Sequence, residues 1–281
     1  MIDLSKQRLE RYHRGELSFD LIDSGPLEGE AVVLLHGFPE TAQCWDQVRV
    51  QLNAAGFRTF APNQRGYSLD ARPEGRQAYR MQELLQDLDL LIDQINQPVH
   101  LVGHDWGAIV AWEYAMHYPK KLKNLVVLSV PHPGAFLRAL LASDQLFKSY
   151  YIGLFQLPKL PELLFEKFPK IGLGLLKNSG MTKQQLEIFK TEMLEQGRLS
   201  YSLNWYRALP FNARFQRFDP VTVPTLFIGG TQDVAISDAG VKLNQRYVQA
   251  PYREVMLEAN HWLPVQQAAV VSQLILEQIQ A

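Results

Sequence analysis

The sequence predicts an α/β fold in which helices cover both faces of a mostly parallel sheet and a helical cap is inserted between two strands. Strand patterns alternate with helical patterns before Pro131 and return after Pro224. Between these two prolines the strand patterns disappear, and helical patterns rich in Leu and Phe replace them. The 281 residues suffice for one large core and an insertion. We therefore assign residues 1–131 and 223–281 to the core and residues 132–222 to the cap.

Short apolar or alternating runs bounded by turn residues predict the strands. Residues 17–22 alternate around Phe19 and Leu21 and end at a Ser-Gly-Pro turn, which predicts an edge strand. Buried strands are predicted at residues 32–35, 57–61, 99–102, 125–130, 225–228 and 254–257. Because helical patterns separate most of these runs, we expect a mostly parallel sheet.

Two helices of the core are predicted before residue 99. Residues 45–54 have a helical pattern that is closed by Gly56, and residues 81–95 place Leu and Ile at helical spacing. Asp87, Asp89 and Asp93 occupy the other positions of the second helix, where we expect them to be solvated. The second pattern therefore predicts an amphipathic helix packed on the sheet.

A tight turn follows the strand at residues 99–102. Helical spacing begins after Gly107, so the chain must change direction between Gly103 and Gly107, with Asp105 at the apex. Strand and helix approach closely at such a turn, which requires small flanking side chains. The Gly-x-Asp-x-Gly spacing is that of the nucleophile elbow of α/β hydrolases, with Asp where esterases carry Ser. By itself the motif is also compatible with an ordinary turn or a helix N-cap.

An Asp at this apex favours substitution at a saturated carbon. A Ser must lose a proton before it attacks a carbonyl, whereas a carboxylate is already an anion at neutral pH and can displace a leaving group. The product would be an alkyl ester of Asp105, which water must cleave. This chemistry requires a base that activates water and donors that stabilise an oxyanion.

His261 is the best candidate for that base among the seven histidines. It follows the strand at residues 254–257 and precedes the C-terminal helix, which is the position of the base in α/β hydrolases. His36 and His104 lie beside the predicted site loops, where we expect them to have structural roles through hydrogen bonds to the backbone.

Asp233 is the candidate for the acid that orients the base. It follows the strand at residues 225–228 and lies between Asp105 and His261 in the sequence, as the fold's order of nucleophile, acid and base requires. A helix cap is the alternative explanation of Asp233. The backbone N–H groups of Phe38 and Trp106 are the candidate oxyanion donors, because Trp106 directly follows Asp105 and Phe38 lies in the loop after the strand at residues 32–35, which is the arrangement that α/β hydrolases use.

The composition excludes several classes of binding partner and cofactor. The net charge of −1 gives no electrostatic basis for binding nucleic acid or an anionic membrane. Cys44 is the one cysteine, so neither an intrachain disulfide nor a cysteine-based zinc site can form, as expected of a cytoplasmic protein. The first ten residues carry charges throughout and do not resemble a signal peptide. No apolar run is long enough to span a bilayer, and no cofactor or metal is implied.

Taken together, these motifs resemble those of the soluble epoxide hydrolases of the α/β-hydrolase fold family. The matching segments are the His-Gly-Phe-Pro-Glu run at residues 36–40, the elbow at 103–107, Asp233, His261, and two cap segments at 151–156 and 203–207. In that family one Tyr from each cap segment donates a hydrogen bond to the epoxide oxygen. The resemblance assigns these roles to Tyr151 and Tyr206, with Tyr150 as the alternative for the first.

The sequence therefore predicts an enzyme that needs no cofactor and converts a small apolar epoxide and water into a vicinal diol through an ester of Asp105. An epoxide opens to an alkoxide, which needs a hydrogen-bond donor and a proton, and a phenol supplies both. Four residues are expected to contact the substrate: Phe38, Trp106, Phe155 and Trp205. A monomer or a homodimer is expected.

Two other functions remain open. Haloalkane and haloacetate dehalogenases share the Asp elbow, the His and the fold, but haloalkane dehalogenases typically have Asn where Phe38 stands, and fluoroacetate dehalogenases have Arg where Trp106 stands. The third possibility is a catalytically silent hydrolase fold that serves as a receptor or scaffold. Candidates at all three positions of the triad argue against it.

Overall fold

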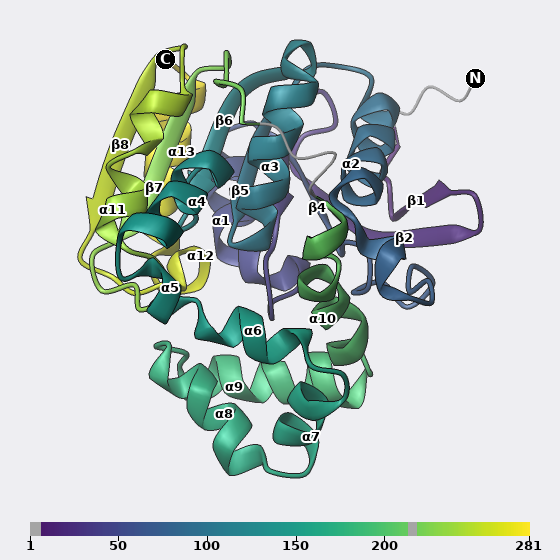
Figure 1. Ribbon diagram of the computed structural model, residues 1–281. Coiled ribbons are helices and arrows are strands. Elements are labelled where there is room, and N and C mark those ends of the chain that lie inside the picture. Colours follow the sequence, from purple (N-terminus) through teal and green to yellow (C-terminus); the bar gives the residue numbers. More distant parts are fainter. Residues whose placement is uncertain (1–6, 213–217) are drawn as a thin grey trace.

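The computed structural model of the chain describes residues 7–212 and 218–281 (Figure 1). Within these residues the strands form one eight-stranded sheet with the order β1-β2-β4-β3-β5-β6-β7-β8. Strands β3 to β8 run parallel to one another, whereas β2 runs antiparallel to both of its neighbours, β1 and β4. The strands are β1 Arg11–Arg14, β2 Leu17–Ser24, β3 Ala31–Leu35, β4 Arg58–Pro62, β5 Val99–His104, β6 Leu122–Leu128, β7 Thr225–Gly230 and β8 Tyr252–Leu257.

The predicted mostly parallel sheet is confirmed, with one strand missed. Strand β1 has the sequence Arg-Tyr-His-Arg, which shows no apolar alternation, so no strand is predicted there. It forms because the Tyr12 ring stacks on Phe19 of β2 with 4.7 Å between the ring centroids. Strand β6 ends at Leu128 rather than at residue 130, because Ser129 has a φ of 68° and leaves the extended conformation.

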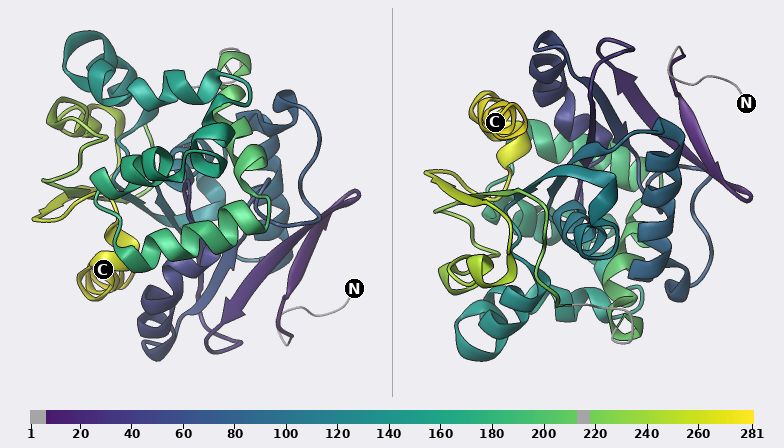
Figure 2. Two further views of the ribbon diagram at one scale, coloured as in Figure 1. Left: turned by 90° about the horizontal axis from the view of Figure 1, so that it is seen from below. Right: turned by 90° about the horizontal axis from the view of Figure 1, so that it is seen from above.

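Helices cover both faces of the sheet, as the alternation of strands and helices predicts. Alternate strand residues such as Val32 and Val102 pack with α1 and α13, whereas Val33 and Leu101 on the opposite face pack with α2 and α3. Figures 1 and 2 show these two helical layers. The core helices are α1 Asp46–Ala54, α2 Met81–Ile95, α3 Trp106–His117, α11 Asp238–Val241, α12 Leu263–Gln266 and α13 Ala268–Ile279, with short 3-10 turns at η2 Ala42–Trp45, η3 Arg76–Tyr79, η4 Pro119–Lys121 and η7 Asn244–Tyr247.

One expectation about α2 is wrong. Asp87 is only 4% exposed, although we expect it to be solvated from its position in the pattern. Its carboxylate receives two hydrogen bonds from the guanidinium of Arg65, at 2.6 and 2.7 Å, and one from Arg14 at 2.9 Å. Both arginines come from segments distant in sequence, and together they compensate the buried charge.

The segment that we assign to the cap forms helices between β6 and β7, and these lie at the carboxyl ends of the parallel strands, in the lower part of Figure 1. Its described helices are α4 Pro133–Ala142, α5 Gln145–Lys148, α6 Tyr150–Gln156, α7 Leu160–Glu166, α8 Pro169–Asn178, α9 Lys183–Phe189, the π-helical η5 Lys190–Glu195, α10 Leu199–Arg207 and the 3-10 turn η6 Leu209–Phe211. Residues 213–217 of the cap and residues 1–6 of the core, both within our domain assignment, lie outside the described residues.

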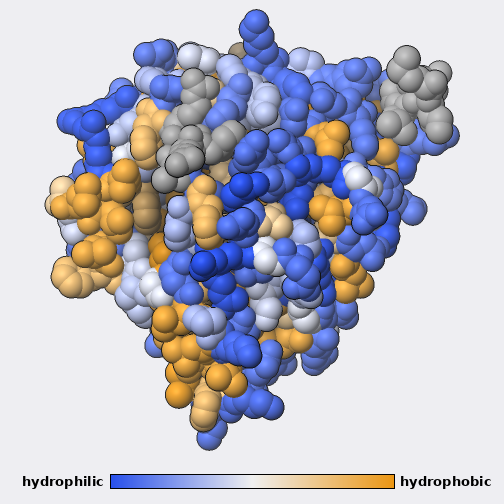
Figure 3. Space-filling model, turned by 45° about the vertical axis from the view of Figure 1, so that its right-hand side comes forward, coloured by the Kyte–Doolittle hydropathy of each residue, from blue (hydrophilic) through white to orange (hydrophobic). Residues whose placement is uncertain are grey.

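The outer side of the cap exposes apolar side chains. Leu160, Leu163, Phe168 and Ile171 of α7 and α8 and the loop between them are each at least 40% exposed. Figure 3 shows hydrophobic residues at the lower end of the molecule, which the cap forms. None of the helices in the described ranges combines the length and the apolar composition that a membrane crossing requires.

Candidate active site

Asp105 lies at the junction between β5 and α3, where the sequence predicts the elbow. Its φ of 53° and ψ of −119° are strained for a residue with a side chain. A Cβ atom on Gly103 would lie 2.3 Å from the carbonyl oxygen of Gly107, and one on Gly107 would lie 2.2 Å from that of Leu35. Only glycine permits this contact between the strand and helix backbones, so the sharp turn presents the carboxylate at the carboxyl edge of the sheet.

Two backbone amides hold the carboxylate of Asp105. The N–H of Phe38, in the loop that follows β3, donates to Oδ1 at 2.7 Å. The backbone N–H of Trp106 also forms a hydrogen bond with this carboxylate. A Cβ atom on Gly37 would lie 2.4 Å from Oδ1, so the absence of a side chain there lets the loop approach Asp105. The two amides predicted as oxyanion donors therefore both donate hydrogen bonds to the carboxylate of Asp105.

The structure brings His261 and Asp233 to the same edge of the sheet. Nδ1 of His261 donates to Oδ2 of Asp233 at 2.6 Å, and Nε2 of His261 lies 3.5 Å from Oδ2 of Asp105. The other oxygen of Asp233 accepts N–H bonds from Ala235 at 2.8 Å and Ile236 at 3.3 Å. These bonds fix the carboxylate, the carboxylate fixes the imidazole, and Nε2 is left directed at Asp105.

Burial and neighbouring charges shift the pKa values of Asp105 and His261 in opposite directions. Burial raises the pKa of Asp105, but the hydrogen bond and positive charge of His261 outweigh it, so the pKa of Asp105 is lowered below its ordinary value. Burial lowers the pKa of His261, but the charge of Asp233 and the bond and charge of Asp105 raise that pKa well above its ordinary value. Asp105 is therefore an anion and His261 a cation at neutral pH.

His36 and His104 are buried and bonded to backbone groups, as expected. His36 accepts the N–H of Gln64 at 3.2 Å and donates from Nδ1 to the carbonyl of Gly37 at 3.1 Å. Burial lowers the pKa of His36 to about 4, so its ring is neutral. His104 donates from Nε2 to the carbonyl of His261 at 2.8 Å. Both rings therefore stabilise the loops of the site through hydrogen bonds to the backbone.

Two cap tyrosines face the carboxylate. Tyr151 of α6 and Tyr206 of α10 have ring centroids 6.2 Å apart, and the Tyr206 ring lies 5.4 Å from that of Phe38. Burial, followed by the negative charge of Asp105, raises the pKa of both phenols above the ordinary value. Tyr150, the alternative to Tyr151, is 62% exposed. The two phenols are therefore protonated, and the ring of Tyr151 packs against Phe155 and Tyr206, whereas Tyr150 is largely exposed.

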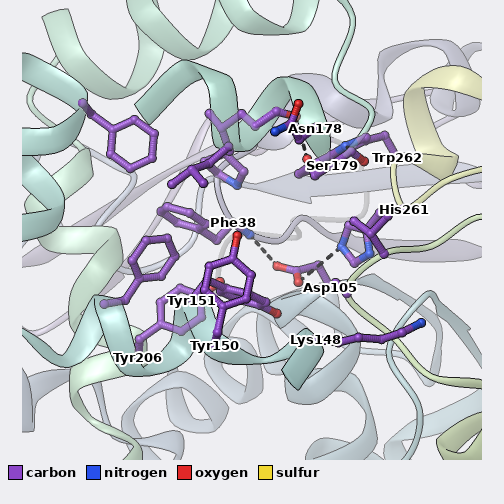
Figure 4. A pocket seen from close by; sticks show the side chains of 17 residues that line it. Phe38, Asp105, Lys148, Tyr150, Tyr151, Asn178, Ser179, Tyr206, His261 and Trp262 are labelled. Atoms are coloured by element: carbon purple, nitrogen blue, oxygen red, sulfur yellow. Dashed lines mark hydrogen bonds and ion pairs between the residues drawn. The ribbon is translucent and has the colours of Figure 1, made fainter. Parts of the chain in front are cut away.

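A cavity of about 300 Å³ contains these groups (Figure 4). In Figure 4 Asp105 lies between His261 and the two tyrosines, and the dashed lines join it to Phe38 and His261. Most of the other lining residues are apolar. The described residues that line the cavity are Phe38, Pro39, Asp105, Lys148, Tyr150, Tyr151, Phe155, Phe165, Leu175, Leu176, Asn178, Ser179, Tyr206, Val234, Ala235, His261 and Trp262.

Two residues that we predict to contact the substrate, Trp106 and Trp205, are not among the described residues that line the cavity. Trp205 is 1% exposed and donates from its indole to the carbonyl of Arg65 at 2.8 Å, so it anchors α10 on the core. The indole of Trp106 forms a hydrogen bond with the hydroxyl of Tyr206, and the two rings meet edge to face at 5.1 Å. Phe38 and Phe155 do line the cavity, whereas neither tryptophan is among its described lining residues.

Several lining residues are missed from the sequence. Phe165 and Leu176 of α7 and α8, and Trp262 beside His261, belong to ordinary apolar patterns. Their spacing indicates burial without telling which of them faces the core and which faces a cavity. Within residues 7–212 and 218–281, no cluster of three or more His, Cys, Asp or Glu side chains is arranged to bind a metal ion.

Comparisons with known proteins agree with this geometry. The alpha/beta hydrolase fold family matches residues 30–268. An AB hydrolase superfamily protein of Bacillus subtilis is 36% identical, over 90% of this chain and 91% of its own length. Epoxide hydrolase 3 of Xenopus tropicalis is also 36% identical, over 92% of this chain and 74% of its own length.

Solved structures show the same likeness. Epoxide hydrolase A of Mycobacterium thermoresistibile superimposes with a TM-score of 0.83 at 26% identity, covering 96% of this chain and 97% of its own. An epoxide hydrolase of Vigna radiata superimposes with a TM-score of 0.80 at 29% identity, covering 96% and 98%. The likeness therefore extends over the core and the cap together.

Proposed function

This chain belongs to the alpha/beta hydrolase fold family and is a hydrolase of that family, and on this premise we propose that it opens an epoxide with water to a vicinal diol. The observation that carries the proposal is the position of two protonated phenols, Tyr151 and Tyr206, opposite the ionised carboxylate of Asp105. The names of the relatives described above support the same reaction. The proposal has two chemical steps.

In the first step a carboxylate oxygen of Asp105 attacks a ring carbon of the epoxide from the side opposite the breaking C–O bond. Oδ2 is the attacking oxygen, because Oδ1 is already held by the N–H of Phe38. The epoxide oxygen leaves as an alkoxide and receives a proton from Tyr151 or Tyr206, whose hydrogen bonds stabilise the developing charge. The product is an ester that joins the opened substrate to Asp105.

In the second step water cleaves this ester. Formation of the ester removes the charge of Asp105, which is one of the influences that raise the pKa of His261. The imidazolium can then give up its proton, which restores the phenol that was deprotonated in the first step. The neutral imidazole accepts a proton from water, while Asp233 stabilises the imidazolium that forms again. Hydroxide attacks the carbonyl carbon, the N–H groups of Phe38 and Trp106 stabilise the oxyanion, and the diol leaves as Asp105 is regenerated.

The cavity supports a small apolar substrate. Aromatic and aliphatic side chains such as Phe38, Phe155, Phe165 and Leu176 form most of the wall, so an apolar group on the epoxide is transferred out of water on binding. The polar groups converge near Asp105, where the three-membered ring must lie.

A dehalogenase that uses the same nucleophile is the rival activity. It needs no proton for its leaving group, so two buried phenols would have no chemical role in it. Incubation with styrene oxide, stilbene oxide, haloalkanes and fluoroacetate tests both the epoxide hydrolase and the dehalogenase activity, with diol and halide measured in parallel. We expect diol from an epoxide. Halide without diol would establish the dehalogenase, and neither product from any of these compounds would contradict both activities.

A further inference from the structure

The cap is connected to the loop of His261 by a chain of side-chain amides. Gln266 of α12 donates from Nε2 to the carbonyl of Gly180 and to Oε1 of Gln185, both at 2.8 Å. Its Oε1 accepts the amide N–H of Asn260 at 2.9 Å, and Asn260 also donates to Gly180 at 3.3 Å. Gly180 precedes α9 and Gln185 belongs to it, so Gln266 links the cap to the residue before His261.

The residue after His261 is connected to the cap as well. The indole of Trp262 donates to the carbonyl of Ser179 at 3.1 Å, and the backbone N–H of Trp262 donates to Oδ1 of Asn260 at 3.0 Å. A Cβ atom on Gly180, whose φ is +99°, would lie 2.4 Å from the amide nitrogen of Asn260. The cap thus touches the loop so closely that a side chain at Gly180 would displace it.

The core holds the same loop from the opposite side. The carbonyl of His261 accepts hydrogen bonds from Nε2 of His104 at 2.8 Å and from the hydroxyl of Ser129 at 3.0 Å. The backbone of His261 is therefore clamped between core donors and cap partners. In this position Nε2 of His261 lies 3.5 Å from Oδ2 of Asp105.

We propose that Gln266 is a positioning residue that orients His261 for hydrolysis of the ester, an inference that rests on the proposed function. The hydrogen bonds described for Gln266 reach the cap and the loop of His261, and within the described ranges none reaches the elbow of Asp105 or the helices that carry Tyr151 and Tyr206. The first step uses those groups, whereas the second uses His261. Loss of the Gln266 bonds should therefore slow the second step selectively.

Rapid quenching of single-turnover mixtures measures the two steps separately, as formation and decay of the substrate adduct on Asp105. In Gln266→Met the side chain keeps its length and loses all three bonds. We expect adduct formation at the wild-type rate and decay about tenfold slower, since a small displacement of a catalytic group has effects of this size or larger. The adduct should then accumulate at steady state, with kcat lowered.

Two further variants keep the test decisive. Gln266→Glu retains the bond from Asn260 but loses both donors to the cap, and it should show the same selective loss if the apolar variant does not fold. Gln267→Met is the matched control, because Gln267 is also half-buried and makes no side-chain capping bond at the start of α13. The inference would be overturned if Gln266→Met slowed both steps equally, or if it lowered only the melting temperature and left the rates of adduct formation and decay unchanged. A wild-type enzyme that forms neither adduct nor diol would instead overturn the proposed function.

Discussion

His261 and Asp105 face each other with Nε2 and Oδ2 separated by 3.5 Å. The two oxygens of Asp105 are therefore in different environments, because Oδ1 accepts the N–H of Phe38 at 2.7 Å. In the mechanism that we propose, the oxygen that faces His261 attacks the epoxide, and the imidazole activates water once the ester has formed. The same contact also explains why the pKa of Asp105 is lowered although the residue is buried.

Replacement of the nucleophile should abolish turnover without unfolding the protein. In Asp105→Ala no anion is available to attack, so kcat should fall by at least about 10⁴-fold. Diol formation measured by chromatography tests this, with circular dichroism as the check on folding. Substantial turnover by a folded Asp105→Ala protein would exclude the covalent route.

The two cap tyrosines should act on ring opening. Tyr151→Phe and Tyr206→Phe each remove one donor to the developing alkoxide, which should slow adduct formation by roughly a hundredfold. The double variant should be slower still. Tyr150→Phe tests the alternative assignment of the first tyrosine, and we expect it to slow adduct formation less than Tyr151→Phe because Tyr150 is 62% exposed. A normal rate of adduct formation in the double variant would argue for the dehalogenase.

His261→Gln should separate the two steps. An ionised Asp105 needs no base, so the first step should survive at a pH high enough to ionise Asp105 without His261, whereas the ester should persist. Digestion at low pH followed by mass spectrometry should find the substrate mass on the peptide that contains Asp105, at one adduct per chain. If no adduct accumulates while diol still forms, water attacks the epoxide directly and Asp105 acts as a base.

The hydrolysis step should depend on pH through His261. Its imidazole must be neutral to accept a proton, so the rate of adduct decay should fall as pH drops through the pKa of His261 in the ester intermediate. The charge of Asp233 raises that pKa. In Asp233→Asn the acid limb should therefore move to lower pH, while the plateau rate falls by roughly a thousandfold. An acid limb that does not move would show that Asp233 has no influence on the protonation of His261.

Asp87 should contribute to stability rather than to chemistry. In Asp87→Asn the buried guanidinium of Arg65 loses its counter-charge, so the free energy of unfolding should fall by about 3 kcal/mol. Asp93→Asn on the same helix is the control, since that side chain is 57% exposed and should change stability by less than about 1 kcal/mol. Urea denaturation measures both, and equal losses would contradict the role given to burial.

The elbow and the positions of Asp233 and His261 after strands could be predicted because their signals are local. Gly103, Asp105 and Gly107 show the turn by spacing alone, since only glycine permits the backbone contacts found there. Helix α2 also has the bounds that its periodicity predicts. Strand-to-helix alternation similarly predicts that Asp233 and His261 follow strands, and parallel strands place their carboxyl ends on one edge.

Other features were decided by contacts between distant segments. Asp87 is buried because Arg14 and Arg65 reach it from other parts of the chain, and no pattern within α2 indicates such partners. In the cap, Trp205 turns to the carbonyl of Arg65 while Tyr206 beside it faces Asp105.

The sequence by itself therefore determined the sheet, the elbow and the candidates for the triad, since these depend on periodicity and on the steric demands of a single turn. Only the tertiary structure showed that Tyr150 is largely exposed, and that Phe165 and Trp262 line the cavity whereas Trp106 and Trp205 are not among its described lining residues. The physical reason is that a cap helix is apolar on more than one side. The side that faces the cavity is set by how the helix packs on the core, through hydrogen bonds such as that from Trp205 to Arg65.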